Sequence, residues 1–522
     1  MKSFVVVLLC ELLWTVPGCV GSAEDAGEAG EADEVRSAGD ASEPSPLDET
    51  FADVVARRLG GHDQMPNNLL VRDVSGAYTT VSSRGIIDLN NEFFQDLGRN
   101  GRRCVTCHVP TAGWTITPHQ LQVAFEATDG GVYDDGLGLS AVFRTNDGAN
   151  SPNANVSTKA KRRVAYSMLL NKGLVRVGLA IPANAEFELV AVDDPYHYAS
   201  AAELSLFRRP LPVANLKFDS AVMWDGREVV PGQAVVSELL TQASDATMTH
   251  AQGQALSAAQ RQSIVDFELS LASAQVTDGQ AGNLTDGGAR GGPSAILAQS
   301  FYVGINDNFG DSQTGAPFTS NVFTLFDSWA STPGHHAEPD LDHLRERDAD
   351  GDNHHDGVRT VEARQAIARG QALFNTHPIA ITGVSGINDE VVFGKPATLM
   401  GTCSSCHNTP NGGNHSVVAP LDIGLVDASR RTKDMPLYTL RNKTTGQVVQ
   451  VTDPGRAMID GKWSHIGRFK GPMLRNLAPR APYFHNGFAA DLPAVVDFYD
   501  TRFSIGFSQQ DKADLVAFLR SL

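Results

Sequence analysis

Four of the six cysteines in this sequence of 522 residues fall in two copies of one short motif, C-x-x-C-H. The copies are Cys104-Val105-Thr106-Cys107-His108 and Cys403-Ser404-Ser405-Cys406-His407. Two thiols at this spacing can form thioethers with the two vinyl groups on one edge of a porphyrin, and the adjacent histidine can reach the iron. The motifs therefore predict two covalently bound c-type hemes, with the four cysteines as attachment points and His108 and His407 as proximal iron ligands.

Three other kinds of site use closely spaced cysteines: a zinc site, a redox dithiol and a disulfide. A structural zinc site needs a third and a fourth Cys or His close by, and each motif would need its own set. A thioredoxin-like dithiol needs a βαβ context, which the sequence around the motifs lacks. Heme attachment is therefore the favoured interpretation.

The N-terminal residues resemble a secretory signal, because Lys2 is followed by an apolar core over residues 4–9. An acidic residue interrupts this core, so a buried N-terminal helix is the competing interpretation. Residues 16–19 (VPGC) are similar to a bacterial lipoprotein cleavage box, in which the proline is a poor fit. We expect a signal peptide over residues 1–19 and a periplasmic or otherwise exported protein, whose membrane link would be at most a lipid anchor at Cys19. An exported location agrees with heme attachment, which takes place outside the cytoplasm.

The sequence is acidic, with 60 acidic and 42 basic side chains and a net charge of −18. Half of this charge lies in residues 22–50, which contain almost no large apolar side chain, so we expect a disordered acidic tether over residues 20–50. The acidic balance argues against nucleic-acid binding, which needs a basic patch. No stretch of the mature chain reaches the roughly 18 consecutive apolar residues of a membrane span.

A second internal repeat marks where each unit ends. Residues 256–271 (LSAAQRQSIVDFELSL) and 507–522 (FSQQDKADLVAFLRSL) align without gaps. In both, a serine stands where a helix N-cap would be, and apolar residues follow at helical spacing. Phe93-Phe94 and Leu373-Phe374 also suggest a helix before each motif. We therefore expect a mainly α fold of two cytochrome c-like domains with long loops, whose hemes face the domain interface.

The expected domains are an N-terminal one over residues 51–275 and a C-terminal one over residues 361–522, separated by a linker or insertion over residues 276–360. Residues 276–293 are rich in Gly and Asp, as in a surface loop. The stretch from Asp348 to Gly357 partly resembles a calcium loop. Asn353 and Arg359 stand where such a loop needs Gly and Glu, so a solvated linker is favoured.

Further motifs resemble the bacterial diheme cytochrome c peroxidase family, which includes the MauG-type enzymes, over most of residues 85–522. Trp224-Asp225-Gly226-Arg227 is similar to the family's W-D-G-R, and the stretch 469–476 (FKGPMLRN) to the residues before its P-Y-F-H motif. Pro482-Tyr483-Phe484-His485-Asn486-Gly487 matches that motif, and 495–499 (VVDFY) follows at the family's spacing. The resemblance implies a peroxide site at the N-terminal heme and an electron-transfer role for the C-terminal heme.

The family places a Gln about eighteen residues after the tryptophan, and a Glu about ten residues further on, over the reactive heme. Gln242 stands eighteen residues after Trp224, but no Glu follows, and His250 lies eight residues beyond Gln242. We predict that His250 takes the distal role, because a neutral imidazole can accept a proton from peroxide and return it to the leaving oxygen. Ligation of the iron by His250 and a purely structural role remain alternatives.

The resemblance also implies a sixth ligand and an electron relay. Fourteen residues after the P-Y-F-H histidine, simple peroxidases of the family carry Met and MauG-type members carry Tyr; this chain has Tyr499. We predict that Tyr499 is a ligand of the C-terminal heme. Met473 and Met458 are the alternative ligands, and the alternative role for Tyr499 is that of an aromatic side chain packed in the core. Trp224 is predicted to relay electrons between the hemes; the alternative is a packed aromatic in a turn.

Calcium between the domains is a further family feature, for which the carbonyls of Arg480 and Pro482 would be ligands. The family's asparagine, fifteen residues before the tryptophan, is replaced here by Arg209. A cation at that position argues against the usual calcium site.

Three functions are compatible with these residues. The first is a peroxidase that reduces hydrogen peroxide with electrons from a small redox donor protein, such as a cytochrome c or a cupredoxin. The second is a MauG-type oxidase that uses peroxide to oxidise a protein or organic partner through high-valent iron. The third is a diheme electron carrier without catalysis. His250 near Gln242 favours an enzyme, and Tyr499 keeps the second function close to the first.

Overall fold

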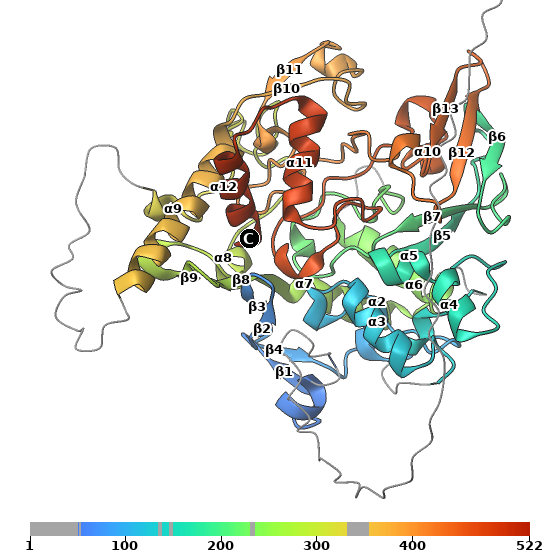
Figure 1. Ribbon diagram of the computed structural model, residues 1–522, viewed down its shortest axis with the longest axis horizontal. Coiled ribbons are helices and arrows are strands. Elements are labelled where there is room, and N and C mark those ends of the chain that lie inside the picture. The colour runs from blue at the N-terminus through green and yellow to red at the C-terminus, as the bar shows by residue number, and fades with distance from the viewer. Residues whose placement is uncertain (1–50, 52–53, 134–137, 146–149, 230–234, 331–353) are drawn as a thin grey trace, which may run out of the picture. The chain divides into compact units, whose positions relative to one another are not determined.

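The computed structural model describes residues 51, 54–133, 138–145, 150–229, 235–330 and 354–522 (Figure 1). The expected signal peptide and acidic tether lie outside these residues, as does most of the aspartate-rich stretch of the expected linker. Within the described residues, no helix is both long enough and apolar enough to cross a membrane.

Helices occur along the whole described chain. The α-helices are α2 (Cys104–Cys107), α3 (Pro118–Ala127), α4 (Lys159–Ala165), α5 (Ser167–Lys172), α6 (Val235–Thr249), α7 (Ala258–Ser270), α8 (Pro293–Leu297), α9 (His354–Thr376), α10 (Ala457–Asp460), α11 (Leu492–Phe503) and α12 (Gln509–Arg520). A π-helical turn, η1, covers Val54–Arg58, and short 3₁₀ turns include η2 (Glu92–Phe94), η7 (Asp327–Trp329) and η9 (Cys403–Ser405).

The strands form several small sheets. They are β1 (Gln64–Pro66), β2 (Val71–Asp73), β3 (Gly76–Ser82), β4 (Ile86–Asp88), β5 (Val175–Leu179), β6 (Phe187–Asp193), β7 (Leu204–Arg208), β8 (Leu271–Asp278), β9 (Gly282–Asn283), β10 (Ile379–Ile381), β11 (Leu399–Gly401), β12 (Leu437–Asn442) and β13 (Val448–Val451). The strand orders are β1-β4, β10-β11, β13-β12-β6, β2-β3-β8-β9 and β5-β7.

The expected mainly α fold is wrong. Of the residues that the structure describes, 34% are helical and 17% are in strands, which makes this a mixed α/β structure. The long segments between the motifs and the closing helices carry Val, Leu and Phe in short runs such as β5 and β6, which suit strands. Strands β3 and β6 pair with β8 and β12, far away in the chain. A local periodicity signal cannot reveal such pairings.

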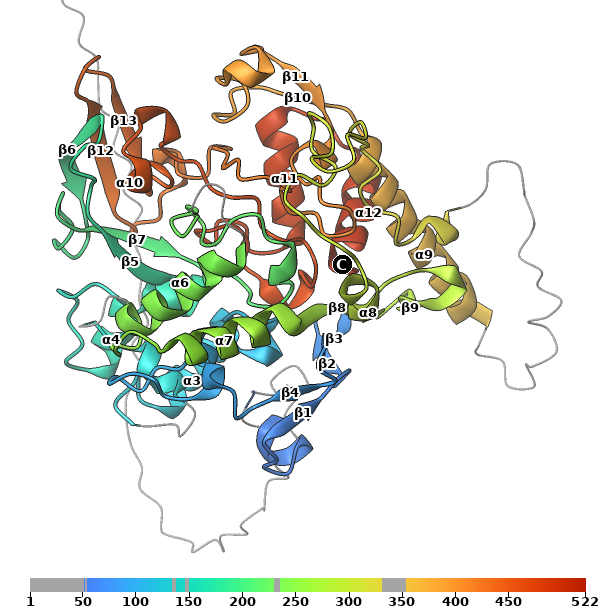
Figure 2. The same ribbon diagram turned by 180° about the vertical axis from the view of Figure 1, so that it is seen from behind.

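One sheet joins the two halves of the chain. Strand β6 pairs antiparallel with β12, so that Phe187 lies opposite Asn442 and Asp193 opposite Leu437. Strand β13 then pairs with the other edge of β12. Both views show these three strands side by side (Figures 1 and 2). The sheet therefore links the segment expected to form the N-terminal domain to the one expected to form the C-terminal domain.

The two predicted closing helices are present as α7 and α12. The side-chain oxygens of Ser257 and Ser508 accept hydrogen bonds from the third backbone N–H of each helix, which completes a capping box in both. Helix α12 packs against α9 and α11 (Figure 1). The predicted repeat therefore corresponds to two helices with the same N-terminal cap.

Equivalent aromatic residues on the closing helices pack toward the motifs. The ring of Phe267 lies 5.1 Å from that of Phe93, and the ring of Phe518 lies 5.7 Å from that of Phe374. Phe374 lies on α9 as expected. Phe93 belongs only to the short turn η2, because the glycine-containing stretch 97–101 (LGRNG) follows it and favours turns over a longer helix.

Part of the expected linker is packed into a core. Leu284, Phe323, Phe326 and Trp329 are buried in one apolar cluster with residues of α9 and α12. The Trp329 ring stacks on that of Phe326 at 5.0 Å. Residues 281–329 therefore contribute to the same core as the C-terminal helices.

Candidate functional site

Two large cavities lie next to the two C-x-x-C-H motifs. Cavity 1, of about 1470 Å³, is lined by Cys104, Cys107 and His108. Cavity 2, of about 1590 Å³, is lined by the second motif's Cys403, Cys406 and His407. Both volumes include space open to solvent, and each cavity is lined by the two cysteines and the histidine of one motif.

The two motifs begin with the same local turn. The backbone N–H of Arg103 donates to Thr106 Oγ1 at 3.0 Å, and that of Thr402 donates to Ser405 Oγ at 3.0 Å. The histidine N–H of each motif then donates to the carbonyl of its first cysteine at 3.1 Å. A hydroxyl at the third position therefore closes a turn that holds both thiols and the histidine at the cavity wall.

Each motif histidine has a ring nitrogen available to a ligand. His407 Nδ1 lies 2.6 Å from the carbonyl oxygen of Gly413, an acceptor, so Nδ1 carries the proton and the Nε2 lone pair is free. The Nδ1 of His108 is buried and makes no hydrogen bond within the described residues. Burial lowers the pKa of His108 to about 4. Both rings are therefore neutral at pH 7, as iron ligation requires.

The residues around the cavities fit covalent heme better than the other cysteine chemistries. The four motif cysteines form no disulfide with any described residue. Burial raises the pKa of Cys104 and Cys403 to about 12. Among the described residues, no group of three or more His, Cys, Asp or Glu side chains could hold a metal ion. Cavity 1 also has a basic lining, which suits the two propionates of a heme; it consists of Arg102, Arg103, Arg176, Arg208, Arg209, Arg227 and Lys470.

The predicted distal residues line cavity 1 and come from one helix. Gln242 lies on α6, and His250 directly follows its last residue. The backbone carbonyl of His250 accepts hydrogen bonds from Asn100 Nδ2 at 2.8 Å and Arg102 Nη1 at 3.2 Å, which fix the end of the helix. Burial, together with Arg102 and Arg227, lowers the pKa of His250 to about 4. The structure thus brings Gln242, His250 and the first motif to the same cavity.

Tyr499 lines cavity 2. It lies on α11, and its ring packs beside those of Phe498 and Phe503. Burial raises the pKa of its phenol, and Cys406 and Cys403 add to this shift. Met473 and Met458 are buried in other apolar clusters and are not among the residues that line cavity 2. The structure therefore brings Tyr499, and neither methionine, to the wall that also contains the second motif.

Trp224 and Lys470 line both cavities. The indole Nε1 of Trp224 donates to the carbonyl of Arg209 at 2.7 Å, and its carbonyl accepts from the backbone N–H of Lys470 at 2.9 Å. The ring of His485, the histidine of the P-Y-F-H motif, meets the indole edge-on at 6.2 Å between centroids. Trp224 therefore separates the two cavities, between segments from both halves of the chain.

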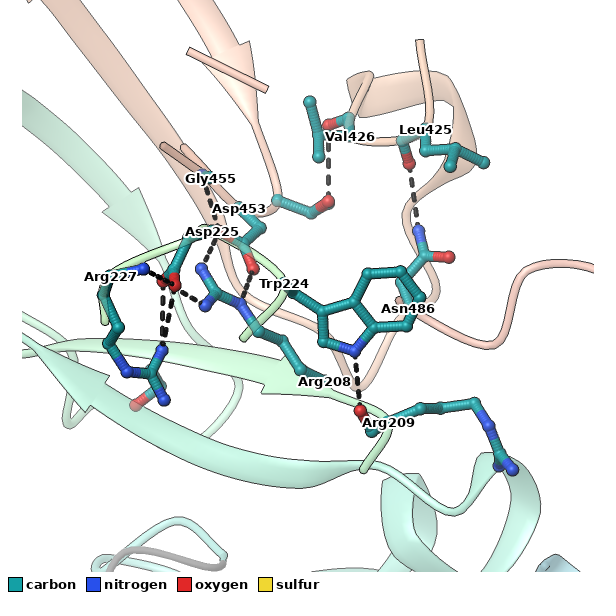
Figure 3. A network of polar contacts seen from close by, with 12 residues as sticks. Arg208, Arg209, Trp224, Asp225, Arg227, Leu425, Val426, Asp453, Gly455 and Asn486 are labelled. Atoms are coloured by element: carbon teal, nitrogen blue, oxygen red, sulfur yellow. Dashed lines mark hydrogen bonds and ion pairs between the residues drawn. The ribbon is translucent and has the colours of Figure 1, made fainter. Parts of the chain in front are cut away.

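A buried charge network lies beside Trp224 (Figure 3). Asp225 is fully buried and pairs with the guanidinium groups of Arg208 and Arg227. Arg208 Nε also donates to Asp453 Oδ2 at 2.7 Å. Because Arg208 ends β7 and Asp453 follows β13, the network ties the two halves together beside the tryptophan. Breaking such a pair leaves an uncompensated buried charge, which is strongly destabilising.

The side chain of Arg209 contacts the Arg480 carbonyl, one of the two carbonyls expected from the resemblance to bind calcium. Its guanidinium donates to three backbone carbonyls, those of Lys172 at 2.7 Å, Ile116 at 2.8 Å and Arg480 at 3.1 Å. The residue is 5% exposed. A guanidinium already supplies the positive charge at these carbonyls, so the residues present do not fit a calcium ion there.

Three further titratable residues line the cavities but were given no role in the sequence analysis. Glu268 on α7 lines cavity 1 and is 5% exposed. His415, 8% exposed, lines cavity 2, and its Nε2 makes no hydrogen bond to any described residue. His485 also lines cavity 2, and its ring stacks on that of Phe469 at 3.9 Å. The alignment of the closing helices could have identified Glu268, because this charged residue aligns with an apolar residue, Leu519, of the C-terminal helix.

Comparison with known proteins identifies relatives of one kind. The cytochrome-c peroxidase IdrP1 of Pseudomonas sp. (strain SCT) is 31% identical over 140 residues, which are 23% of this chain and 36% of that protein. The cytochrome-c peroxidase IdrP2 of Denitromonas iodatirespirans is 31% identical over 135 residues, 24% of this chain and 37% of that protein. The chain thus spans little more than a third of the length of the curated relatives that it matches.

Two further comparisons found less similarity than the comparison with curated proteins. No protein-family model matches the chain. The crystal structure of a MauG-like protein associated with microbial copper homeostasis aligns with 62% of this chain and 77% of its own, at 14% identity and a TM-score of 0.27.

Proposed function

We propose that this chain, a member of the diheme cytochrome c peroxidase and MauG-type family, reduces hydrogen peroxide to water at a heme in cavity 1. In this proposal the electrons arrive through a heme in cavity 2 and through Trp224. The observation that carries the proposal is that Trp224 lines both cavities, each of which has its own C-x-x-C-H motif. The family relationship supports the chemistry, since relatives of this chain are named cytochrome-c peroxidases.

The two cavities differ in the groups that face a ligand. Cavity 1 contains an amide, Gln242, and an imidazole, His250, together with the residues of the first motif. Cavity 2 contains the phenol of Tyr499 and many apolar side chains. This difference supports the assignment of peroxide to cavity 1 and of electron storage to cavity 2.

A heme bound in cavity 1 would supply an iron face for peroxide and a path for electrons. His250 is neutral at pH 7, because burial and the neighbouring Arg102 and Arg227 lower its pKa to about 4. It can therefore take the proton from one peroxide oxygen and return it to the other oxygen as the O–O bond breaks. Gln242 can orient the peroxide by a hydrogen bond from its amide. Two electrons and two protons in total convert one hydrogen peroxide into two waters.

A second candidate function is a MauG-type oxidase, which would use peroxide to oxidise a protein or organic partner. Tyr499 favours it, because an anionic oxygen donor stabilises oxidised iron, whereas a methionine raises the heme potential. A non-enzymatic electron carrier is the third candidate, and the room beside Gln242 and His250 in cavity 1 counts against it.

We further propose a small redox protein, a cytochrome c or a cupredoxin, as electron donor. Heme attachment implies an exported protein, and the periplasm is the proposed location. Any lipid anchor would be at Cys19, which lies outside the described residues.

The test is electron paramagnetic resonance of the as-isolated diferric holoprotein, with and without hydrogen peroxide, alongside peroxide turnover with a reduced small cytochrome. One high-spin and one low-spin heme, with a signal that responds to peroxide and a donor that becomes oxidised, would support the peroxidase. A response to peroxide without donor oxidation would favour the oxidase. Two low-spin hemes indifferent to peroxide, even after partial reduction, would leave an electron carrier.

A further inference from the structure

The two closing helices present different residues to their cavities. In the gap-free alignment of α7 and α12, Ile264 corresponds to Leu515, and Glu268 to Leu519. Ile264 and Glu268 line cavity 1, and Leu515 and Leu519 line cavity 2. The same helical position thus carries a carboxyl group in one cavity and an isobutyl group in the other.

Burial of the Glu268 carboxyl group lowers the stability of the folded protein. The residue is 5% exposed, and its Oε2 makes no hydrogen bond within the part of the chain that the structure describes. A buried polar group without a partner costs roughly 1–3 kcal/mol, which Leu519 avoids at the equivalent position. Burial raises the pKa of Glu268 to about 8, so the group is a neutral carboxylic acid at pH 7. A packing role alone would be better served by the leucine of the other repeat.

The surroundings of Glu268 are those of the reactive cavity. Glu268 and Cys104, the first attachment residue on α2, line the same cavity. The charged and titratable side chains that line this cavity with it are Arg102, Arg103, Cys107, His108, Arg176, Arg208, Arg209, Asp219, Arg227, His250 and Lys470. Glu268 and Asp219 are the two carboxyl groups among these lining residues, and Lys470 Nζ pairs with Asp219 Oδ2 at 2.6 Å. Glu268 is therefore the carboxyl group of this lining that forms no ion pair within the described residues.

We propose that Glu268 is the proton-exchanging residue of cavity 1, which gives up its proton when the centre in that cavity loses an electron and regains one when the electron returns. The electron leaves to hydrogen peroxide and comes back from the small donor protein, and the proton is exchanged with water. One proton then balances one electron in each direction. The inference rests on the proposed function, because it assumes that a heme is bound in cavity 1. In this inference Glu268 balances the charge of the heme and does not contact peroxide.

The direction of the coupling follows from charge. A more positive centre stabilises the carboxylate, so oxidation lowers the pKa of Glu268 and reduction raises it. At pH values between the pKa of the oxidised protein and that of the reduced protein, the oxidised protein has lost this proton while the reduced protein still holds it. The midpoint potential of the centre in cavity 1 should therefore fall with rising pH in that range, by at most about 59 mV for each tenfold change in proton concentration.

The experiment is redox-difference infrared spectroscopy and potentiometry on the full-length holoprotein. In the wild type we expect a carboxylic acid C=O band that changes between the oxidised and reduced states and moves to lower frequency in D₂O. Glu268→Gln and Glu268→Leu should lose this band and the alkaline slope of the potential. The control is Glu238→Gln, because Glu238 is buried on α6 and lines neither cavity.

Glu268→Leu copies Leu519, so it should fold and bind heme at the wild-type ratio of heme to protein. A band or a slope that persists unchanged in both Glu268 variants would overturn the proposal. The proposed function fails separately, by absence of peroxide turnover in the wild type, because the infrared and potential measurements need no peroxide.

Discussion

The indole Nε1 of Trp224 donates a hydrogen bond to the backbone carbonyl of Arg209 at 2.7 Å (Figure 3). The backbone N–H of Arg209 donates in turn to the carbonyl of His485 at 2.7 Å, and the His485 ring meets the indole edge-on. Two segments from opposite halves of the chain therefore fix the orientation of one aromatic side chain that lines both cavities. This is the arrangement that an electron relay between two bound hemes would need.

Replacement of Trp224 by phenylalanine should slow electron transfer between the two hemes. The smaller ring loses the indole N–H and leaves a gap between the cavities. We expect the rate to fall about tenfold or more, which corresponds to about 1.4 kcal/mol in the barrier. Stopped-flow spectroscopy of the half-reduced protein measures this rate. The control is Trp329→Phe, because Trp329 packs on Phe326 in the core of the C-terminal helices. An unchanged rate in Trp224→Phe would refute the relay.

The pH dependence of turnover tests His250. A general base must be neutral, and the pKa of His250 is lowered to about 4, so wild-type turnover should be nearly constant from about pH 5 to 8 and fall below about pH 4. His250→Ala should lower turnover by two or more orders of magnitude. Steady-state peroxide assays across this range measure both effects. His119→Ala is the control, since His119 lies on α3 and lines neither cavity. Wild-type turnover in the His250 variant would eliminate the acid/base role.

The motif residues were accessible from the sequence because their chemistry depends on short spacings. A C-x-x-C-H motif brings its cysteines and histidine together within one turn. The serines before the two closing helices are the N-caps of these helices. The structure accordingly brings every predicted site residue to a cavity wall: His108, Trp224, Gln242 and His250 in cavity 1, and His407 and Tyr499 in cavity 2. Their chemical roles remain predictions.

The ligand of the second heme can be tested by substitution at Tyr499. A thioether raises the potential of a heme relative to an anionic oxygen donor. Tyr499→Met should therefore raise the potential of the heme in cavity 2 by about 0.1 V or more, within the roughly 0.8 V that axial ligands control. Potentiometric titration and the visible spectrum measure this. The matched control is Tyr483→Phe, which changes a tyrosine that lines the same cavity and donates to the Leu477 carbonyl. A methionine–iron band already present in the wild type would count against Tyr499.

Arg209 leads to a prediction about metal dependence. Its guanidinium satisfies the carbonyls of Lys172, Ile116 and Arg480, so a calcium chelator should leave the melting temperature of the wild type unchanged. Arg209→Met should destabilise the protein by about 3 kcal/mol or more, because it leaves buried carbonyls unsatisfied at roughly 1–3 kcal/mol each. Thermal denaturation with and without chelator measures both. The exposed Arg84, in an ion pair with Asp266, provides the control Arg84→Ala. A lower melting temperature of the wild type in chelator would contradict the prediction.

What the sequence did not reveal depends on contacts between distant segments. The pairing of β6 with β12 joins positions about 250 residues apart, and the sequence of neither strand indicates which strand it pairs with. The neutral state of Glu268 likewise results from burial by several elements, although its alignment with Leu519 was visible. The prediction of a mainly α fold overstated the helical content for the same reason. It was based on local hydrophobic periodicity, which does not reveal pairing between distant strands.

Loss of the Asp225 carboxylate should weaken the junction between the two halves of the chain. Burial opposes its ionisation, but Arg208 and Arg227 outweigh this and lower its pKa. A carboxylate with a lowered pKa contributes stability above its unfolded pKa of about 3.9, and this contribution disappears as the pH falls through the folded value. Asp225→Asn should therefore cost about 3–5 kcal/mol at pH 7, because Arg208 keeps only Asp453 as a partner.

The wild type should lose this advantage over Asp225→Asn as the pH falls below 4, so the two unfolding curves should approach each other in acid. Chemical denaturation of the holoprotein between pH 3 and 7 measures the difference. Asp266→Asn is the matched control, because Asp266 forms an exposed ion pair worth about 0–1 kcal/mol. Equal stability of Asp225→Asn and Asp266→Asn at pH 7 would show that the buried network does not hold the two halves together, and the fixed orientation of Trp224 would then rest on its backbone hydrogen bonds alone.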